Sequence, residues 1–110
     1  MAIRIRKGSG NVFKDAGFPA AEATHLQIRA DLMLQIERTL KELGLTQVKA
    51  AKVLGISQPR VSDLVRGRIE LFSIDALVEM LDHLGITVTL RTKRSPQSGI
   101  TGAAADKELR

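Results

Sequence analysis

The longest regular pattern of apolar positions lies between Pro19 and Leu43. Proline suits the first position of a helix, where its missing N–H is not needed, and Gly44 provides a stop after the last apolar residue. The apolar stripe consists of Leu32, Ile36, Leu40 and Leu43 and is widened by Leu26, Ala30, Met33 and Leu34. We therefore predict a long helix from Pro19 to about Leu43 that is buried on more than one side.

Two short helices separated by a tight turn are predicted next. Thr46 and Ser57 are residues of the type that cap helices, so the first helix should run from Gln47 to Leu54 and the second from Gln58 to Val65. Gly55 accepts the positive φ that a short turn between crossing helices requires. The aliphatic residues expected to wedge the second helix onto the core are Leu54, Ile56, Val61 and Leu64.

Two further helices flank this central part of the chain. Asn11 can cap a single turn from Val12 to Ala16. Ser73 can cap a helix that runs to Leu84, with Phe72 and Leu77 placed to form a hydrophobic staple. The fold class expected from these patterns is all-α, with five helices and one short C-terminal β-strand.

That strand is predicted from Ile86 to Thr92, where apolar and polar residues alternate. A lone strand is not stable, so we predict antiparallel pairing with the same strand of a second chain. Ile86, Val88 and Leu90 would face the helices and form the dimer contact. The alternative is an intramolecular hairpin with residues 3–6, where Ile and Arg also alternate.

Three parts of the chain are expected. Residues 1–18 form a basic N-terminal arm, mobile rather than an edge strand, followed by a short helical turn. Residues 19–92 form the helical domain. Residues 93–110, polar and rich in Ala, Ser and Gly, form a disordered tail.

Composition narrows the class of protein. The 110 residues suffice for one domain, and its core must be aliphatic because the only aromatic residues are three Phe. The absence of cysteine excludes disulfides and thiolate metal sites. The start of the chain lacks the apolar region of a signal peptide and no stretch suits a membrane span, so we expect a cytoplasmic protein.

Catalysis is not expected either. His25 and His83 lie on separate predicted helices without ligand or triad spacing, and His83 is explained by its place near a helix C-terminus. The acidic residues Asp75, Glu79 and Asp82 are most simply a solvated helix face. We therefore predict no enzyme activity, no metal and no cofactor.

The net charge of +5 is unevenly distributed along the sequence. Residues 1–7, 44–69 and 91–94 are basic, and in the central one of these segments Asp63 is the only acidic residue. Residues 70–90 contain four acidic residues and no Lys or Arg. This distribution is typical of a protein that binds a polyanion such as nucleic acid.

The most specific motif joins the two short helices. Gln47, Ala51, Gly55 and Val61 match the helix-turn-helix of the XRE and lambda-repressor-like family, in which a Gln opens the first helix and Ala, Gly and an aliphatic residue follow at these spacings. The segment resembles that family over roughly residues 30–84. The resemblance implies a DNA-binding protein whose second short helix enters the major groove.

The resemblance also implies which side chains contact DNA. Gln58, Pro59 and Asp63 match the positions that most often touch bases, and Arg60 is expected on the same outward face. Gln58 can pair with adenine. Asp63 can accept from a cytosine amino group or can instead hold Arg60 or Arg66 by a salt bridge. The expected phosphate contacts are Gln47, Lys49, Ser57, Ser62, Arg66 and Arg68.

The layout of the whole chain is similar to small HigA-type antitoxins, on the strength of residues 11–18, the long helix, residues 55–64 and the helix start at residues 72–74. This resemblance implies a homodimeric repressor that binds a palindromic operator and neutralises a HigB- or RelE-like toxin encoded beside it. Two alternatives stay open: a solitary XRE-family regulator, and a protein-interaction module that keeps the fold without binding DNA.

Overall fold

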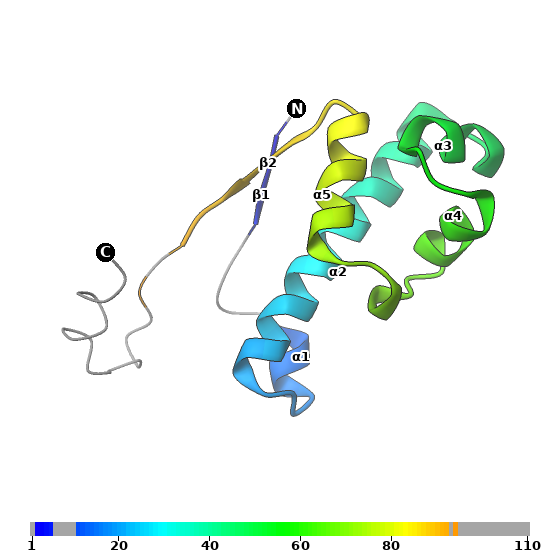
Figure 1. Cartoon of the computed structure of the whole chain (residues 1–110). Helices are drawn as coiled ribbons and strands as arrows, with labels where there is room; N and C mark the ends of the chain where they lie inside the picture. Colours follow the sequence, from blue (N-terminus) through cyan, green and yellow to red (C-terminus); the bar gives the residue numbers. More distant parts are fainter. Residues whose placement is uncertain (1, 6–10, 93, 95–110) are drawn as a thin grey trace.

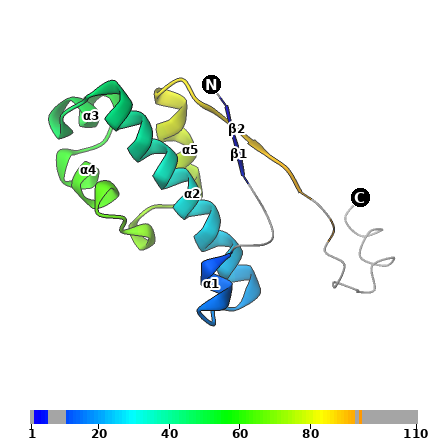
Figure 2. The ribbon, with the colours of Figure 1, turned by 180° about the vertical axis from the view of Figure 1, so that it is seen from behind.

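A computed structural model of the chain describes residues 2–5, 11–92 and 94 (Figures 1 and 2). The elements are, in order, β1 (Ala2–Ile5), α1 (Val12–Asp15), α2 (Ala20–Leu43), α3 (Gln47–Leu54), α4 (Gln58–Val65), the 3₁₀ turn η1 (Ile69–Leu71), α5 (Ile74–His83) and β2 (Thr87–Leu90). Figure 1 shows α2 running through the middle of the molecule, with α1 at one end, α3 and α4 at the other, and the two strands beyond α5. The predicted tail lies outside the described residues, except for Arg94.

The two short helices begin and end at the residues that the sequence predicts. Thr46 Oγ1 accepts a hydrogen bond from the Lys49 N–H at 3.2 Å, and Ser57 Oγ accepts from the Arg60 N–H at 3.3 Å. Each of these bonds satisfies a backbone donor that has no partner within its helix, which fixes where the helix starts. The predicted cap of α5 is made in the same way by Ser73, which accepts from the Ala76 N–H at 3.1 Å.

Other boundaries differ by a residue or two. Pro19 is the N-cap residue of α2, with an extended ψ of 149°, instead of its first helical residue. Helix α1 ends at Asp15 and α5 at His83, each one residue earlier than predicted. The sequence does not predict the 3₁₀ turn η1, because three residues are too few for a periodic pattern.

The core is aliphatic apart from Phe72, as the composition requires. Of the four wedge positions, Leu54, Val61 and Leu64 are buried and Ile56 is half-buried against the core. Phe72 and Leu77 are both buried in the core, as the predicted staple requires. The stripe on α2 is narrower than predicted, because Leu34 and Leu43 remain exposed by 44% and 57%.

The strand β2 has a partner within its own chain, which corrects the expectation that it lacks one. It pairs with β1 in parallel register, from Ala2 beside Thr87 to Ile5 beside Leu90. The segment containing β1 is therefore a strand and not a mobile arm over residues 2–5. The alternative prediction named the right partner, since residues 3–5 belong to β1, but the pairing is not a hairpin. Parallel strands need a crossover connection, and the helices between β1 and β2 supply it.

The side chains of β2 follow the predicted alternation only in part. Ile86, just before the strand, is buried and Val88 is half-buried against the core, so both face the helices as predicted. Leu90 is 69% exposed and does not face them. The reason is that the chain runs away from α5 as it leaves the loop after this helix (Figure 1).

A contact between α3 and α5 explains both Gly55 and His83. Gly55 has a φ of +73°, and a Cβ added there would lie 3.2 Å from Cε1 of His83. The imidazole Nδ1–H of His83 donates to the carbonyl oxygen of Leu54 at 3.0 Å, since a carbonyl can only accept. This bond satisfies a carbonyl in the last turn of α3, so His83 stabilises the start of the turn between the two short helices.

Two arginines hold η1 against the rest of the molecule. Arg29 of α2 donates from Nη1 to the Ile69 carbonyl at 3.4 Å. Arg60 of α4 donates from Nη1 to the Leu71 carbonyl at 3.0 Å, and its guanidinium carbon lies 4.2 Å from the centre of the Phe72 ring. These contacts hold the segment between α4 and α5 against α2 and against α4.

Replacing Gly55 tests the α3–α5 contact. We expect Gly55→Ala to lower the free energy of unfolding by about 1 kcal/mol more than Gly44→Ala, as measured by urea denaturation. Both glycines have a positive φ, so both substitutions carry the backbone penalty, but no atom lies within 4 Å of a Cβ at Gly44. Equal losses for the two variants would contradict the close approach of His83.

Replacing Arg60 tests its contact with Phe72. We expect Arg60→Leu to destabilise the fold by about 1–2 kcal/mol, because it removes a hydrogen bond and a cation over an aromatic ring. Arg66→Leu is the matched control, since this arginine is exposed and its side chain has no hydrogen bond or ion pair with the described residues. Thermal unfolding followed by circular dichroism measures both, and similar midpoints would show that the Phe72 contact adds nothing.

Candidate nucleic-acid interface

The turn between α3 and α4 sets the direction of α4. The N–H groups of Gly55 and Ile56 both donate to the Ala51 carbonyl, at 2.9 and 3.1 Å, which ends α3 and turns the chain sharply. Helix α4 then buries Val61 and Leu64, whose exposed fractions are 1% and 2%. Because these side chains fix one face of α4 against the core, the opposite face must point outward.

The first turn of α4 is exposed. Gln58 and Pro59 lie there and are both open to solvent. Pro59 is the second residue of the helix, where its missing N–H costs no helical hydrogen bond. One turn further on, Ser62 and Asp63 are half-buried. The residues expected to contact bases thus share one surface of α4, with Arg60 as the exception.

Arg60 points elsewhere. Arg60 is half-buried, and its guanidinium lies against the Leu71 carbonyl and the Phe72 ring, so the side chain does not face away from the core as predicted. Within the described part of the chain no ion pair joins Asp63 to Arg60 or Arg66. Sequence reasoning missed the place that Leu71 and Phe72 provide for Arg60, because a three-residue 3₁₀ turn leaves no periodic signal.

The residues expected to contact phosphate lie on α3, on α4 and just after α4. Gln47 and Lys49 are exposed in the first turn of α3, and Arg66 and Arg68 are exposed beyond α4. Ser57 is exposed and its oxygen already accepts the capping bond, which leaves its O–H able to donate. In the sequence these groups lie on both sides of the exposed turn of α4. Contacts to DNA phosphates on both sides of a helix are what hold that helix in position over the bases.

Charge divides between two regions of the described structure. The region of α3 and α4 has several exposed basic side chains and one acidic one, Asp63. Helix α5 has Asp75, Glu79 and Asp82 and no Lys or Arg. A polyanion would therefore approach the molecule on the α3–α4 side.

The described residues offer little for other kinds of site. Among them, no group of three or more His, Asp or Glu side chains could hold a metal ion. His25 and His83 lie on different helices, and the latter is engaged by Leu54. No helix in this part of the chain combines the length and the apolar character that crossing a membrane would take.

Comparisons with known proteins agree with this geometry. A family model described as a helix-turn-helix domain matches residues 12–93. A solved structure named "Putative XRE Family Transcriptional Regulator" is similar to the chain, with a TM-score of 0.63 and 32% sequence identity over 73% of this chain and 88% of that one. Among curated proteins none matches. The prediction of an XRE-like, non-enzymatic fold is confirmed, and the chain belongs to the helix-turn-helix family of DNA-binding, XRE-type transcriptional regulators.

Proposed function

We propose that the chain is a sequence-specific repressor that binds a palindromic operator as a homodimer, with the first turn of α4 in the major groove. The observation that carries this proposal is the outward position of Gln58 and Pro59 on a helix whose inner face is fully buried. A reading helix must be held rigidly, because a small displacement would misalign its hydrogen bonds with the base edges. Its DNA partner makes the cytoplasm the expected place of action.

Base contacts are assigned to three residues of α4. The Gln58 amide can donate to N7 and accept from N6 of adenine, and Asp63 can accept from N4 of cytosine. Pro59 offers only an apolar contact, which suits a thymine methyl group. We assign Arg60 to the positioning of α4 on η1, because its guanidinium is already bound within the chain.

Affinity without sequence preference would come from contacts to the DNA backbone. Lys49, Arg66 and Arg68 are proposed as charged phosphate contacts, whereas Gln47, Ser57 and Ser62 would donate hydrogen bonds. The caps occupy the N–H groups of Lys49 and Arg60, and Pro59 has no N–H, so the first-turn N–H groups that remain for an anion are those of Gln47, Val48 and Gln58.

Dimerisation is proposed through Ile86, Val88 and Leu90. A single helix-turn-helix reads few base pairs, and a two-fold dimer on a palindrome doubles the contacts. The 69% exposure of Leu90 supports this assignment, since the large apolar side chain lies on a strand with one strand neighbour in the described sheet.

We further propose that the repressor is the antitoxin of a pair with a HigB- or RelE-like toxin. This rests on the resemblance of the chain layout to HigA-type antitoxins, including the short helix α1 before the long helix α2. A solitary XRE-type regulator is the competing assignment.

Substitution in α4 tests base reading. The probe is a duplex that the wild-type chain selects from a randomised pool, compared with a random duplex by fluorescence anisotropy. We expect Gln58→Ala to lose about 1–3 kcal/mol of preference for the selected site and to bind random duplex as the wild type does. A variant that selects the same site with the same preference would remove Gln58 from the interface.

Substitution in α3 tests backbone contacts. Lys49→Ala should weaken binding to selected and random duplexes by the same factor and lower the slope of log K against log salt by about 1. Lys14→Ala, which removes an exposed charge from α1, serves as the control and should leave both affinities unchanged. Loss of the selected site alone in Lys49→Ala would contradict a phosphate contact.

The antitoxin role is tested by co-expression. If an adjacent gene encodes a small ribonuclease-like protein that stops growth, the full chain should restore growth and co-purify with that protein. Growth arrest that persists, or the lack of such a gene, would leave the solitary regulator as the function.

A further inference from the structure

A pocket of about 440 Å³ lies between α2 and the first turn of α5. It is lined by His25 and Arg29 of α2 and by Ser73, Ile74 and Asp75 at the start of α5. Sites for small molecules commonly have volumes of about 300–1,000 Å³, with a few polar groups that fix the orientation of the ligand. The pocket is therefore large enough for a metabolite of the size of an amino acid.

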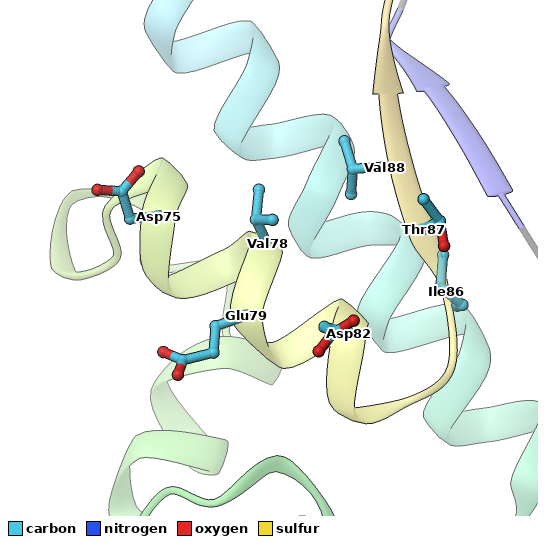
Figure 3. Close-up of a pocket in the computed structure, with 7 residues that line it drawn as sticks. All are labelled: Asp75, Val78, Glu79, Asp82, Ile86, Thr87 and Val88. Carbon is cyan, nitrogen blue, oxygen red and sulfur yellow. The ribbon is translucent and has the colours of Figure 1, made fainter.

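The charges of this pocket distinguish it from the larger groove between α5 and β2 (Figure 3). Among the described residues that line that groove, of about 490 Å³, the charged ones are all acidic: Asp75, Glu79 and Asp82. Figure 3 shows Asp75 at the end of α5 remote from Ile86, with its carboxylate pointing away from β2. Asp75 lines both spaces, and in the smaller pocket it shares the lining with an arginine.

The two opposite charges of the pocket are not in direct contact. Arg29 and Asp75 lie on different helices, and in the described part of the chain no ion pair joins them. Arg29 donates from Nη1 to the Ile69 carbonyl at 3.4 Å, and the other N–H groups of this half-buried residue have no partner among the described residues. A cation and an anion that border the same space without touching can bind two ends of one ligand.

We propose that this pocket is an effector site for a free amino acid with an aliphatic side chain. The Arg29 guanidinium binds the carboxylate of the ligand, and the Asp75 carboxylate binds its ammonium group. Ser73 Oγ accepts the capping bond from the Ala76 N–H, which leaves its O–H able to donate to the carboxylate of the ligand. Ile74, which is half-buried, supplies the apolar contact for the aliphatic side chain.

A zwitterion suits the pocket better than an ion of either sign. Asp75 repels a simple carboxylate, and Arg29 repels a simple amine. An amino acid offers each of these residues an opposite charge, so neither residue loses water without gaining a partner when the ligand enters. The pocket should therefore select the whole amino acid over a molecule that carries only one of its two charges.

Arg29 connects the pocket to the DNA-binding helix. The same side chain contacts η1, which is the next element after α4. A ligand bound between Arg29 and Asp75 joins α2 to α5, the helix that follows η1, and so restricts the segment that ends the reading helix. A bound amino acid should strengthen operator binding, and the operator should strengthen amino acid binding by the same factor. This effector role rests on the DNA binding of the proposed function, whereas the pocket and its ligand do not.

Thermal unfolding of the full chain tests the site, with L-leucine as the probe. L-leucine at about 10 mM should raise the midpoint by about 2 °C or more, because it binds the folded chain. Two analogues each lack one of its charges: 3-methylbutylamine has no carboxylate, and 4-methylpentanoate has no ammonium group. Each analogue should raise the midpoint by less than about a quarter of that amount. No increase with L-leucine, or an equal increase with both analogues, would overturn the site.

Two substitutions test which residue binds which charge. Asp75→Asn should remove the preference for L-leucine over 4-methylpentanoate, and Arg29→Gln should remove the preference over 3-methylbutylamine, because each variant loses the group that recognises the missing charge. Each comparison is made within one variant, so a lower stability of Arg29→Gln does not affect it. Glu42→Gln is the matched control, since it removes an exposed carboxylate near the other end of α2 and should keep both preferences. Wild-type preferences in Asp75→Asn and Arg29→Gln would show that these residues do not bind the ligand.

Fluorescence anisotropy with the selected duplex tests the effector role. L-leucine at about 10 mM should tighten duplex binding by the wild type about fivefold and should not change duplex binding by Asp75→Asn. A wild type that binds L-leucine with no change in its affinity for the duplex would contradict the effector role. A wild type that selects no duplex would overturn the proposed DNA binding, while the thermal shift with L-leucine would still support or exclude the site.

Discussion

Burial of one face of α4 is the constraint on which the rest of the structure depends. A helix of eight residues is not stable by itself in water, so its position comes from packing. Val61 and Leu64 supply that packing inside the core, and Arg60 adds a contact to Phe72 at the side. The exposed turn with Gln58 and Pro59 takes its direction from these three contacts, so the core determines how this turn is presented at the surface.

The same constraint explains why the surrounding elements are arranged as they are. The buried stripe of α2 belongs to the same core into which both short helices pack, and His83 reaches from α5 to the end of α3. The segment after α4 is held by one arginine from α2 and one from α4 itself. Each of these contacts is distant in sequence and limits how α4 can tilt.

Local signals made α3 and α4 predictable to the residue. Thr46 and Ser57 act within three residues of themselves, and the buried positions follow from helical periodicity. The partner of β2 could not be chosen in this way, because strand pairing joins residues some 85 positions apart (Thr87 and Ala2) and alternation alone does not reveal direction. The exposure of Leu90 depends on where the chain runs after α5, which is also a tertiary property.

Prediction of the candidate site from the sequence is limited in the same way, because tertiary contacts decide where side chains point. The outward position of Gln58 followed from helical geometry, whereas the inward position of Arg60 depends on a carbonyl and a ring contributed by residues 71 and 72. In the sequence, an arginine on α4 that packs against its own chain looks the same as an arginine that contacts DNA. Only the fold distinguishes a side chain that contacts the core from one that is available to a ligand.

The parallel pairing of β1 with β2 has a consequence for biosynthesis. Strand β1 leaves the ribosome before the described helices but finds its neighbour β2 only after α5 has been made. The helices can pack from contacts that are mostly closer in sequence, so the sheet closes late and joins the two ends of the domain. A surface that includes β2 can therefore form only after the helix-turn-helix has been synthesised.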